Sequence, residues 1–171
     1  AADMQIAENL ALARRRGQRR GLAWGITRQE KQEYPDLLKT LDLGLETRLT
    51  AKVGLLSGGQ RQALTLLMAT LTDPKLLLLD EHTAALDPKT AKKVLDLTEK
   101  IVTERNLTTL MITHNMNDAI RLGNRLIMMH EGHIIYDVQG EEKRSLTVPD
   151  LLQKFEEVSG GELANDRMLL S

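Results

Sequence analysis

The stretch from Leu76 to Thr113, LLLLDEHTAALDPKTAKKVLDLTEKIVTERNLTTLMIT, decides the fold class. It begins with LLLL and ends with TTLMIT, two short and mainly apolar runs that are typical of strands covered on both faces. The residues between them predict a helix, because Pro88 suits a first helical turn and apolar side chains recur on one face. A strand, a helix and a second strand in this order predict a parallel sheet with a right-handed crossover, and hence an α/β fold.

The residues before this stretch are predicted to be mainly helical. Apolar positions at helical spacing indicate one helix in residues 4–16 and another in residues 59–72. Thr27 and Glu30 have the spacing of a capping box, which predicts that a further helix begins there. Pro35 is expected to break or restart that helix, because an interior proline removes a backbone hydrogen bond.

The residues after this stretch predict a short helix, a β-hairpin and a last helix. The short helix covers residues 115–122 and is ended by Gly123. Residues 125–138, RLIMMHEGHIIYDV, are typical of a hairpin with Glu-Gly in its turn. The last helix is expected from Thr147 to about Glu157, and the residues beyond it are expected to form a loose tail.

The composition excludes several classes of function. Apolar residues make up 42% of the chain, enough for a core, and the net charge of −1 gives no global attraction to nucleic acid or anionic membranes. Aromatic residues make up 2%, which disfavours base-stacking platforms. Cysteine is absent, which excludes a disulfide scaffold and a cysteine-based zinc site. No apolar run approaches the ~18–20 residues of a spanning helix, so a membrane role is expected to go through a partner.

Two adjacent carboxylates, Asp80 and Glu81, end the first apolar run. Ligands bind at the carboxyl ends of strands in α/β proteins. In nucleotide hydrolases such an acid holds Mg²⁺, often through water, and a following Glu can polarise the attacking water. His114 follows the second predicted strand with the same polarity and could reach the same crevice. The alternatives are a strand end capped by solvated acids and an ordinary surface or core histidine.

A second group of polar residues opens the helix predicted in residues 59–72. A hydroxyl, two glycines and an amide stand there in a row: Ser57, Gly58, Gly59 and Gln60. Bare N–H groups at a helix start suit a phosphate, although a glycine-rich helix start is also common without any ligand. Asp87 has a structural interpretation as the N-cap of the following helix, which does not exclude a place in a contact loop.

Taken in order, the motifs LSGGQ, LLLLDE, A-A-L-D and strand-His resemble the ATP-binding subunit of ABC transporters over about residues 1–140. The resemblance implies ATP and Mg²⁺ as cofactors and a role in powering the transport of a small solute. It also implies a role for each motif: Leu56–Gln60 as the signature motif, Leu76–Asp80 as Walker B with Asp80 holding Mg²⁺ through water, Glu81 as catalytic base, Ala84–Asp87 as the D-loop and His114 as the switch histidine.

The resemblance further implies a partial P-loop NTPase core with a parallel sheet, preceded by a helical subdomain and ending in a β-hairpin and a helix. Residues 1–56 would be the helical subdomain, which faces the membrane subunits in this family. Residues 57–158 would be the C-terminal part of the α/β core, and residues 159–171 the loose tail.

The family also implies the partners. Two ATPase subunits pair head to tail, so Ser57, Gly59 and Gln60 would meet the γ-phosphate bound by the second subunit. Membrane permease subunits and an extracytoplasmic substrate-binding protein are expected, with this subunit on the cytoplasmic face of the plasma membrane and no nucleic acid. The sequences DEHTAALDP and GNRLIMMHEG resemble an importer branch with amino-acid-type permeases. His82 departs from the family, because most members have Pro there; it is either a second titrating group near Glu81 or a neutral local substitution.

No G-x-x-x-x-G-K-[ST] sequence occurs in the 171 residues. Because Walker A and the Q-loop precede the resembled region in this family, the chain is expected to be incomplete, inactive alone, and prone to self-association through uncovered apolar strands. Three hypotheses stay open: the C-terminal part of an importer ATPase, a non-enzymatic remnant that binds a complete subunit, and a soluble ABC ATPase acting on nucleic acid. The arginines within 14–20 are the only hint of nucleic acid, and a solvated or permease-facing loop is the alternative.

Overall fold

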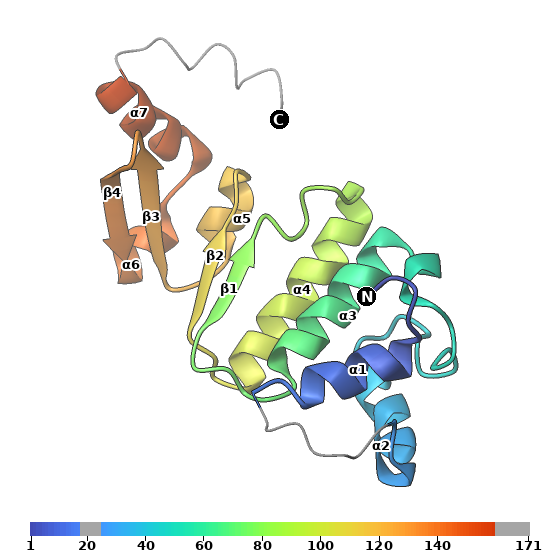
Figure 1. Ribbon diagram of the computed structural model, residues 1–171. Helices are drawn as coiled ribbons and strands as arrows, with labels where there is room; N and C mark the ends of the chain where they lie inside the picture. Colours follow the sequence, from blue (N-terminus) through green and yellow to red (C-terminus); the bar gives the residue numbers. More distant parts are fainter. Residues whose placement is uncertain (18–24, 160–171) are drawn as a thin grey trace. The chain divides into compact units, whose positions relative to one another are not determined.

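The computed structural model describes residues 1–17 and 25–159, and the chain divides into two compact units, Ala1–Met111 and Ile112–Ser171 (Figure 1). This division concerns contacts within the chain. The boundary predicted at residue 56, between a helical subdomain and an α/β core, does not coincide with the division at residues 111 and 112, and it stays a prediction. Within the described ranges, no helix combines the length and hydrophobicity that crossing a bilayer requires.

The first unit contains most of the helices and one pair of strands. Its elements are α1 (Ile6–Arg14), α2 (Arg28–Lys39), the short 3-10 helix η1 (Val53–Leu55), α3 (Gly58–Thr70), β1 (Leu77–Asp80), α4 (Pro88–Glu104) and β2 (Thr109–Ile112), whose last residue lies past the boundary. One core joins α1, α2 and α3 through side chains that are almost inaccessible to solvent: Ile6, Leu10, Tyr34, Leu38, Leu64 and Leu67.

Local capping sets the helix starts that the sequence predicts. The Thr27 hydroxyl accepts a hydrogen bond from the Glu30 backbone N–H at 3.1 Å, and the Glu30 carboxylate accepts one from the Thr27 N–H at 2.7 Å. This reciprocal pair confirms the predicted capping box at the start of α2.

The prediction that Pro35 breaks α2 is wrong, because the helix runs through it. An interior proline costs about 3 kcal/mol. Tyr34 and Leu38, on either side of Pro35, are both fully buried in the core with α1 and α3. Burying two large apolar side chains contributes about 1.5–3 kcal/mol each, which outweighs the cost of the proline.

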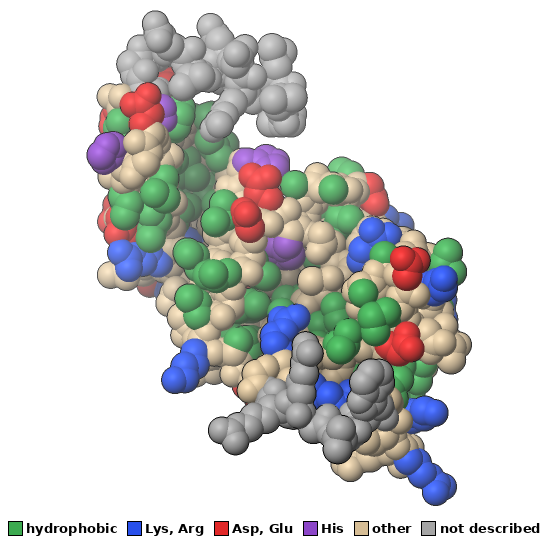
Figure 2. All heavy atoms as spheres, in the orientation of Figure 1, with side chains coloured by type: hydrophobic (Ala, Val, Ile, Leu, Met, Phe, Trp, Pro, Cys, Tyr) green, Lys and Arg blue, Asp and Glu red, His purple; other side chains and the backbone are tan. Residues whose placement is uncertain are grey.

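The strands β1 and β2 pair with each other and run in the same direction, as predicted (Figure 1). On one face, Leu77 and Leu79 are buried together with side chains of α3 and α4. On the other face Leu78 is 64% exposed and Leu110 is 51% exposed. The prediction of strands covered on both faces is therefore wrong for the described chain, because α3 and α4 pack on the same side of the pair. Figure 2 shows hydrophobic side chains at the surface over these strands.

The second unit is built on an antiparallel hairpin. Its elements are α5 (Met116–Arg121), β3 (Arg125–His130), β4 (His133–Gln139), α6 (Gly140–Ser145) and α7 (Val148–Ser159). The hairpin is confirmed, and its two-residue turn has φ of 47° at Glu131 and 80° at Gly132, as a type I′ turn requires. The helix α6 was not predicted. Residues 160–171 of the predicted loose tail lie outside the described residues.

A buried lysine connects two elements of this unit. Lys143 of α6 is 4% exposed, and its ammonium donates to the backbone carbonyls of Ile120 and Leu122 at the end of α5, the second at 3.0 Å. Burial lowers the pKa of Lys143 from its usual value. A cation at a helix C-terminus completes carbonyls that have no partner within the helix.

Candidate functional site

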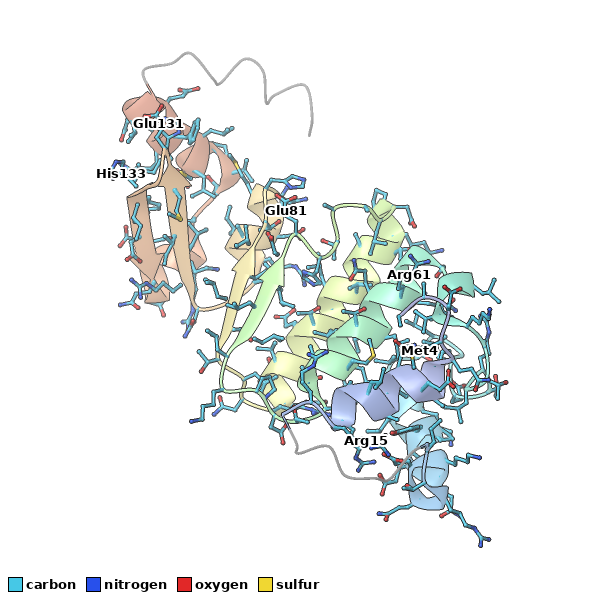
Figure 3. All side chains as sticks on the ribbon, viewed as in Figure 1. Met4, Arg15, Arg61, Glu81, Glu131 and His133 are labelled. Atoms are coloured by element: carbon cyan, nitrogen blue, oxygen red, sulfur yellow. The ribbon has the colours of Figure 1, made fainter. Side chains whose placement is uncertain are left out.

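The carboxyl end of β1 carries the two predicted acids. Asp80 is the last residue of the strand and Glu81 follows it, and both are exposed. Figure 3 shows Glu81 where β1 ends, and Figure 2 shows acidic side chains gathered there. Glu81 has a φ of 41°, in the left-handed region that costs a non-glycine residue about 1–2 kcal/mol. The strand end therefore holds a carboxylate on a backbone that the surrounding structure must keep in place.

The segment after Glu81 turns toward α4. The Ala84 N–H donates to the Glu81 carbonyl at 3.0 Å, and the Leu86 N–H donates to the Thr83 carbonyl at 3.1 Å. His82 lies beside α4, with its Nε2 atom 3.1 Å from Oγ1 of Thr98. Thr98 is 4% exposed, so this contact lies at the edge of the core.

Asp87 caps α4 as predicted. Its carboxylate accepts a hydrogen bond from the Thr90 N–H at 3.0 Å, and Pro88 occupies the first helical position. The pKa of Asp87 is lowered from its usual value, chiefly by hydrogen bonding from Thr90. Asp87 is therefore ionised at neutral pH, and it fixes the end of the segment that begins at Glu81.

The predicted phosphate-binding residues form a second capping box at the start of α3. The Ser57 hydroxyl accepts from the Gln60 N–H at 3.3 Å, and the Gln60 side-chain oxygen accepts from the Ser57 N–H at 3.2 Å. The Gln60 amide also donates to the carbonyl of Leu43 at 3.2 Å. The Ser-x-x-Gln spacing predicts this box, so Ser57 and Gln60 have structural partners before any ligand is considered.

The two glycines of this motif are explained by close packing against the segment before α4. A Cβ added at Gly58 would lie 2.8 Å from a methyl group of Leu86, and one added at Gly59 would lie 2.2 Å from a methyl group of Thr90. A larger residue at Gly59 would force the start of α3 away from Thr90, whereas at Gly58 the end of the Leu86 side chain would have to move. The glycines thus let the start of α3 lie against the segment that leads from Glu81 to α4.

A cavity of about 450 Å³ opens beside the start of α3. Ser57 and Gln60 line one side of it, and Lys93 and Lys100 of α4 line another. Asp42 and Asp96 line the same cavity, so the two ammonium groups are balanced by two carboxylates and the lining side chains carry no net charge.

His114 lies in the second unit, between β2 and α5. It is exposed, and the segment around it is ordered by local bonds, since the Thr113 hydroxyl accepts from the Asn115 N–H and the Asn115 side chain caps Asp118 of α5. Asp80 and Glu81 belong to the first unit. The predicted grouping of His114 with these two acids stays a prediction.

The donor set at β1 fits Mg²⁺ bound mainly by water and phosphate. No group of three or more metal-ligating side chains lies together in residues 1–17 and 25–159. Mg²⁺ commonly keeps several waters and is held by one or two carboxylates together with phosphate oxygens.

The arginines at the end of α1 are occupied by acids of α2. Arg14 pairs with Glu33 at 2.5 Å and Arg15 with Glu30 at 3.0 Å. These ion pairs account for two of the five arginines within residues 14–20 without any nucleic acid. Arg19 and Arg20 lie outside the described residues.

Sequence reasoning missed Thr90 and Thr98 as residues of the site, and it missed the contact that Leu86, within the predicted D-loop, makes with Gly58. Leu86 and Thr90 pack against the glycines of α3, and Thr98 meets His82. No local pattern marks these residues, because each contact joins segments that are 16 or more positions apart in the chain.

Comparison with known proteins places these features in a family. A family model described as "ABC transporter" matches residues 2–84. The tyrosine transport ATP-binding protein of Clostridioides difficile (strain R20291) is 50% identical over 153 residues, which are 90% of this chain and 61% of that protein. The methionine import ATP-binding protein MetN of Streptococcus pneumoniae is 40% identical over 112 residues, which are 65% of this chain and 31% of that protein. The chain thus spans less than two thirds of the length of these relatives.

Solved structures show the same fold. An ATP-binding cassette of an ABC transporter in its ADP conformation is similar with a TM-score of 0.70 at 26% identity, over 90% of this chain and 63% of that one. A dimeric post-hydrolysis state of an ATP-binding cassette, bound to ADP and Pi, has a TM-score of 0.64 at 29% identity, over 81% of this chain and 58% of that one. These likenesses confirm the predicted ABC ATPase fold.

Proposed function

We propose that this chain, which belongs to the ABC transporter family of ATP-binding subunits, helps to hydrolyse ATP in order to drive uptake of a small solute. The solute class that we propose is an amino acid. This is supported by the two curated relatives, one of which is named for tyrosine transport and the other for methionine import.

The end of β1 supplies the hydrolytic residues in this proposal. The Asp80 carboxylate would hold Mg²⁺, partly through water, and the ion would supply positive charge to neutralise the phosphates. Glu81 accepts a proton from the attacking water, a contribution of about 10²–10⁴ in rate for a general base. His114 acts at the same nucleotide. ATP and Mg²⁺ are the cofactors of the complete site.

The start of α3 serves a different nucleotide. The Gly59 N–H and the Ser57 hydroxyl proton are directed to the γ-phosphate held by a second ATPase subunit, in a head-to-tail dimer. Ser57 can do this while it caps α3, because a hydroxyl has one donor and two acceptor positions. The permease subunits and an extracytoplasmic substrate-binding protein complete the assembly, with this subunit at the cytoplasmic face of the membrane.

One observation carries the proposal: Leu86 and Thr90 lie against Gly58 and Gly59. The segment from Glu81 to Asp87 therefore connects the hydrolytic end of β1 with the start of α3 inside one unit. A movement that docks α3 on a partner's nucleotide is then transmitted to the segment that carries Glu81, which makes hydrolysis conditional on dimer closure.

The 171 residues alone are not expected to bind MgATP tightly. They contain no G-x-x-x-x-G-K-[ST] sequence, and so no Walker A lysine or loop of N–H groups for the β-phosphate. The pairing of Arg14 and Arg15 with acids of α2 gives no support to a soluble ATPase that acts on nucleic acid.

Substitution of Glu81 by Gln tests the proposal in the subunit that contains these residues. Glu81→Gln should abolish ATP turnover and leave ATP-bound dimers that light scattering detects, because the nucleotide is held while the base is lost. Glu131→Gln is the matched control, since Glu131 is also an exposed Glu with a positive φ, 47°, but lies in the hairpin turn. Turnover at the wild-type rate in Glu81→Gln would show that Glu81 is not the base.

A further inference from the structure

The backbone at Glu81 needs support from outside its own turn. Its φ of 41° is unfavourable for a residue with a side chain, and the peptide that follows it is the first one after β1 ends. The strand holds the residue on one side, and on the other side the Ala84 N–H bonds the Glu81 carbonyl at 3.0 Å. The contact that holds the next residue, His82, contributes to keeping Glu81 in this conformation.

His82 is held by a buried hydroxyl of α4. Its Nε2 atom lies 3.1 Å from Oγ1 of Thr98, and Oγ1 of Thr98 lies 2.8 Å from the backbone carbonyl of Val94. A carbonyl oxygen can only accept, so the single proton of the hydroxyl points to Val94. The hydroxyl oxygen is then an acceptor toward His82, and the imidazole must carry its proton on Nε2.

The α4 end of this bond is rigid. Thr98 lies on the buried face of α4 together with Val94, Leu95 and Ile101, which are all less than 9% exposed. A hydrogen bond at such a place is less weakened by water than one at the surface. The segment from residue 81 to residue 87 is thereby attached to α4 at both ends. His82 contacts the Thr98 hydroxyl near its start, and the Asp87 carboxylate accepts from the Thr90 N–H at its end.

We propose that His82 is a positioning residue, which, through its Nε2–H bond to Thr98, keeps Glu81 in the left-handed conformation that aims its carboxylate at the attacking water. The catalytic part of this statement rests on the proposed role of Glu81 as the base. The histidine side chain itself takes no part in proton transfer.

The bond can be removed from either side with small changes. Thr98→Val deletes the hydroxyl with almost no change of volume, and His82→Leu deletes the donor. Thr98→Ser keeps the hydroxyl and is the conservative rescue. Thr70→Val is the matched control, because Thr70 is also fully buried and also donates to a carbonyl four residues back, that of Leu66 at 3.0 Å.

The ATPase subunit that contains these residues provides a structural readout. Histidine nitrogen NMR should show the proton of His82 on Nε2 in the wild type. Thr98→Val and His82→Leu should speed amide hydrogen exchange at least tenfold at Ala84 and Leu86, whose N–H groups close the turn after Glu81. Thr98→Ser and Thr70→Val should leave this exchange at the wild-type rate. A proton on Nδ1 alone, or unchanged exchange in both Thr98→Val and His82→Leu, would overturn the proposal.

The assembled transporter provides the catalytic readout. Thr98→Val and His82→Leu should each lower kcat for ATP about tenfold or more with KM unchanged, and the double variant should be no worse than either single variant. A loss that multiplies in the double variant, or a loss of equal size in Thr70→Val, would overturn the proposal. Glu81→Gln distinguishes failure of the proposed function from failure of the positioning role. If Glu81→Gln keeps ATP turnover, the proposed function is wrong. If Glu81→Gln is inactive while Thr98→Val and His82→Leu turn over ATP at the wild-type rate, the positioning role of His82 is wrong.

Discussion

Ser57 shows how one side chain can serve both the fold and a ligand. Its oxygen accepts from the Gln60 N–H and so completes the first turn of α3, while Gln60 is tied back to the Ser57 N–H and to the carbonyl of Leu43. The proton of the Ser57 hydroxyl is not used in this box. A phosphate that approaches α3 therefore meets a donor whose position the cap has already fixed, which lowers the entropic cost of binding.

Replacing Ser57 by Asp or by Asn separates these two uses. Both residues are good N-caps, so α3 should stay intact in either variant. The Ser57→Asp substitution places a negative charge where the γ-phosphate is expected, and a repulsion of only about 1.4 kcal/mol is a factor of ten in an equilibrium constant. We expect Ser57→Asp to lower ATP-dependent dimerisation, measured by light scattering, at least tenfold below Ser57→Asn. Equal dimerisation in the two variants would contradict a phosphate site at Ser57.

The caps at Thr27 and Asp87 were predicted because capping is local, although the same spacing at Ser57 was interpreted only as a phosphate site. Thr27, Ser57 and Asp87 each bond an N–H three residues on, and that spacing is visible in the sequence. The steric reason for Gly58 and Gly59 could not be predicted, because Leu86 and Thr90 reach them only after β1 and the following turn have formed.

Among the elements, α5 depends most on a single distant side chain. It has six residues, and helices this short are not stable in water by themselves. Apolar side chains of α5 pack on the core of the hairpin, and Lys143 completes the carbonyls of Ile120 and Leu122 at its end. Since α5 begins two residues after His114, the order of the histidine segment depends on this lysine as well.

Lys143→Met should loosen α5 while it keeps most of the buried volume. The loss of both bonds leaves carbonyls without a donor, which costs about 1–3 kcal/mol. Amide exchange at Leu122, whose N–H bonds the carbonyl of Asp118 at 2.9 Å, should become correspondingly faster. Lys154→Met is the control, because Lys154 pairs with Glu157 at 45% side-chain exposure and such a pair contributes about 0–1 kcal/mol. Equal acceleration in both variants would show that Lys143 has no special role.

Element boundaries were predicted well where a local signal sets them and poorly where packing does. The two-residue loop of the hairpin, Glu131 and Gly132, was predicted from the sequence, whereas the positive φ of Glu131 was not, because a residue with a side chain disfavours it. The passage of α2 through Pro35 follows instead from the burial of Tyr34 and Leu38, which the local sequence does not reveal. The uneven cover of β1 is of the same kind, since it depends on α3 and α4 packing on one side.

At the scale of the whole chain, the uncovered face of the β1–β2 pair is the main liability. Leu78 of β1 and Leu110 of β2 are 64% and 51% exposed, and Leu76, which directly precedes β1, is 50% exposed. Covering a leucine fully contributes about 1.5–3 kcal/mol. In the described part of the chain the sheet has only these two strands, so each also has an outer edge without a partner strand. Exposed apolar faces beside open edges promote association.

The 171-residue chain, expressed alone, should therefore associate with itself, and Leu78→Lys should raise its monomer fraction in size-exclusion chromatography with light scattering. The substitution removes an exposed apolar side chain at the centre of this face and adds a charge that opposes stacking, and it should leave the unfolding temperature almost unchanged. Leu79→Lys is the matched control one residue along, where 8% exposure places the new charge in the core with α3 and α4, so this variant should unfold. If the wild-type chain is already a monodisperse monomer, and Leu78→Lys does not raise the monomer fraction, the uncovered face does not drive association.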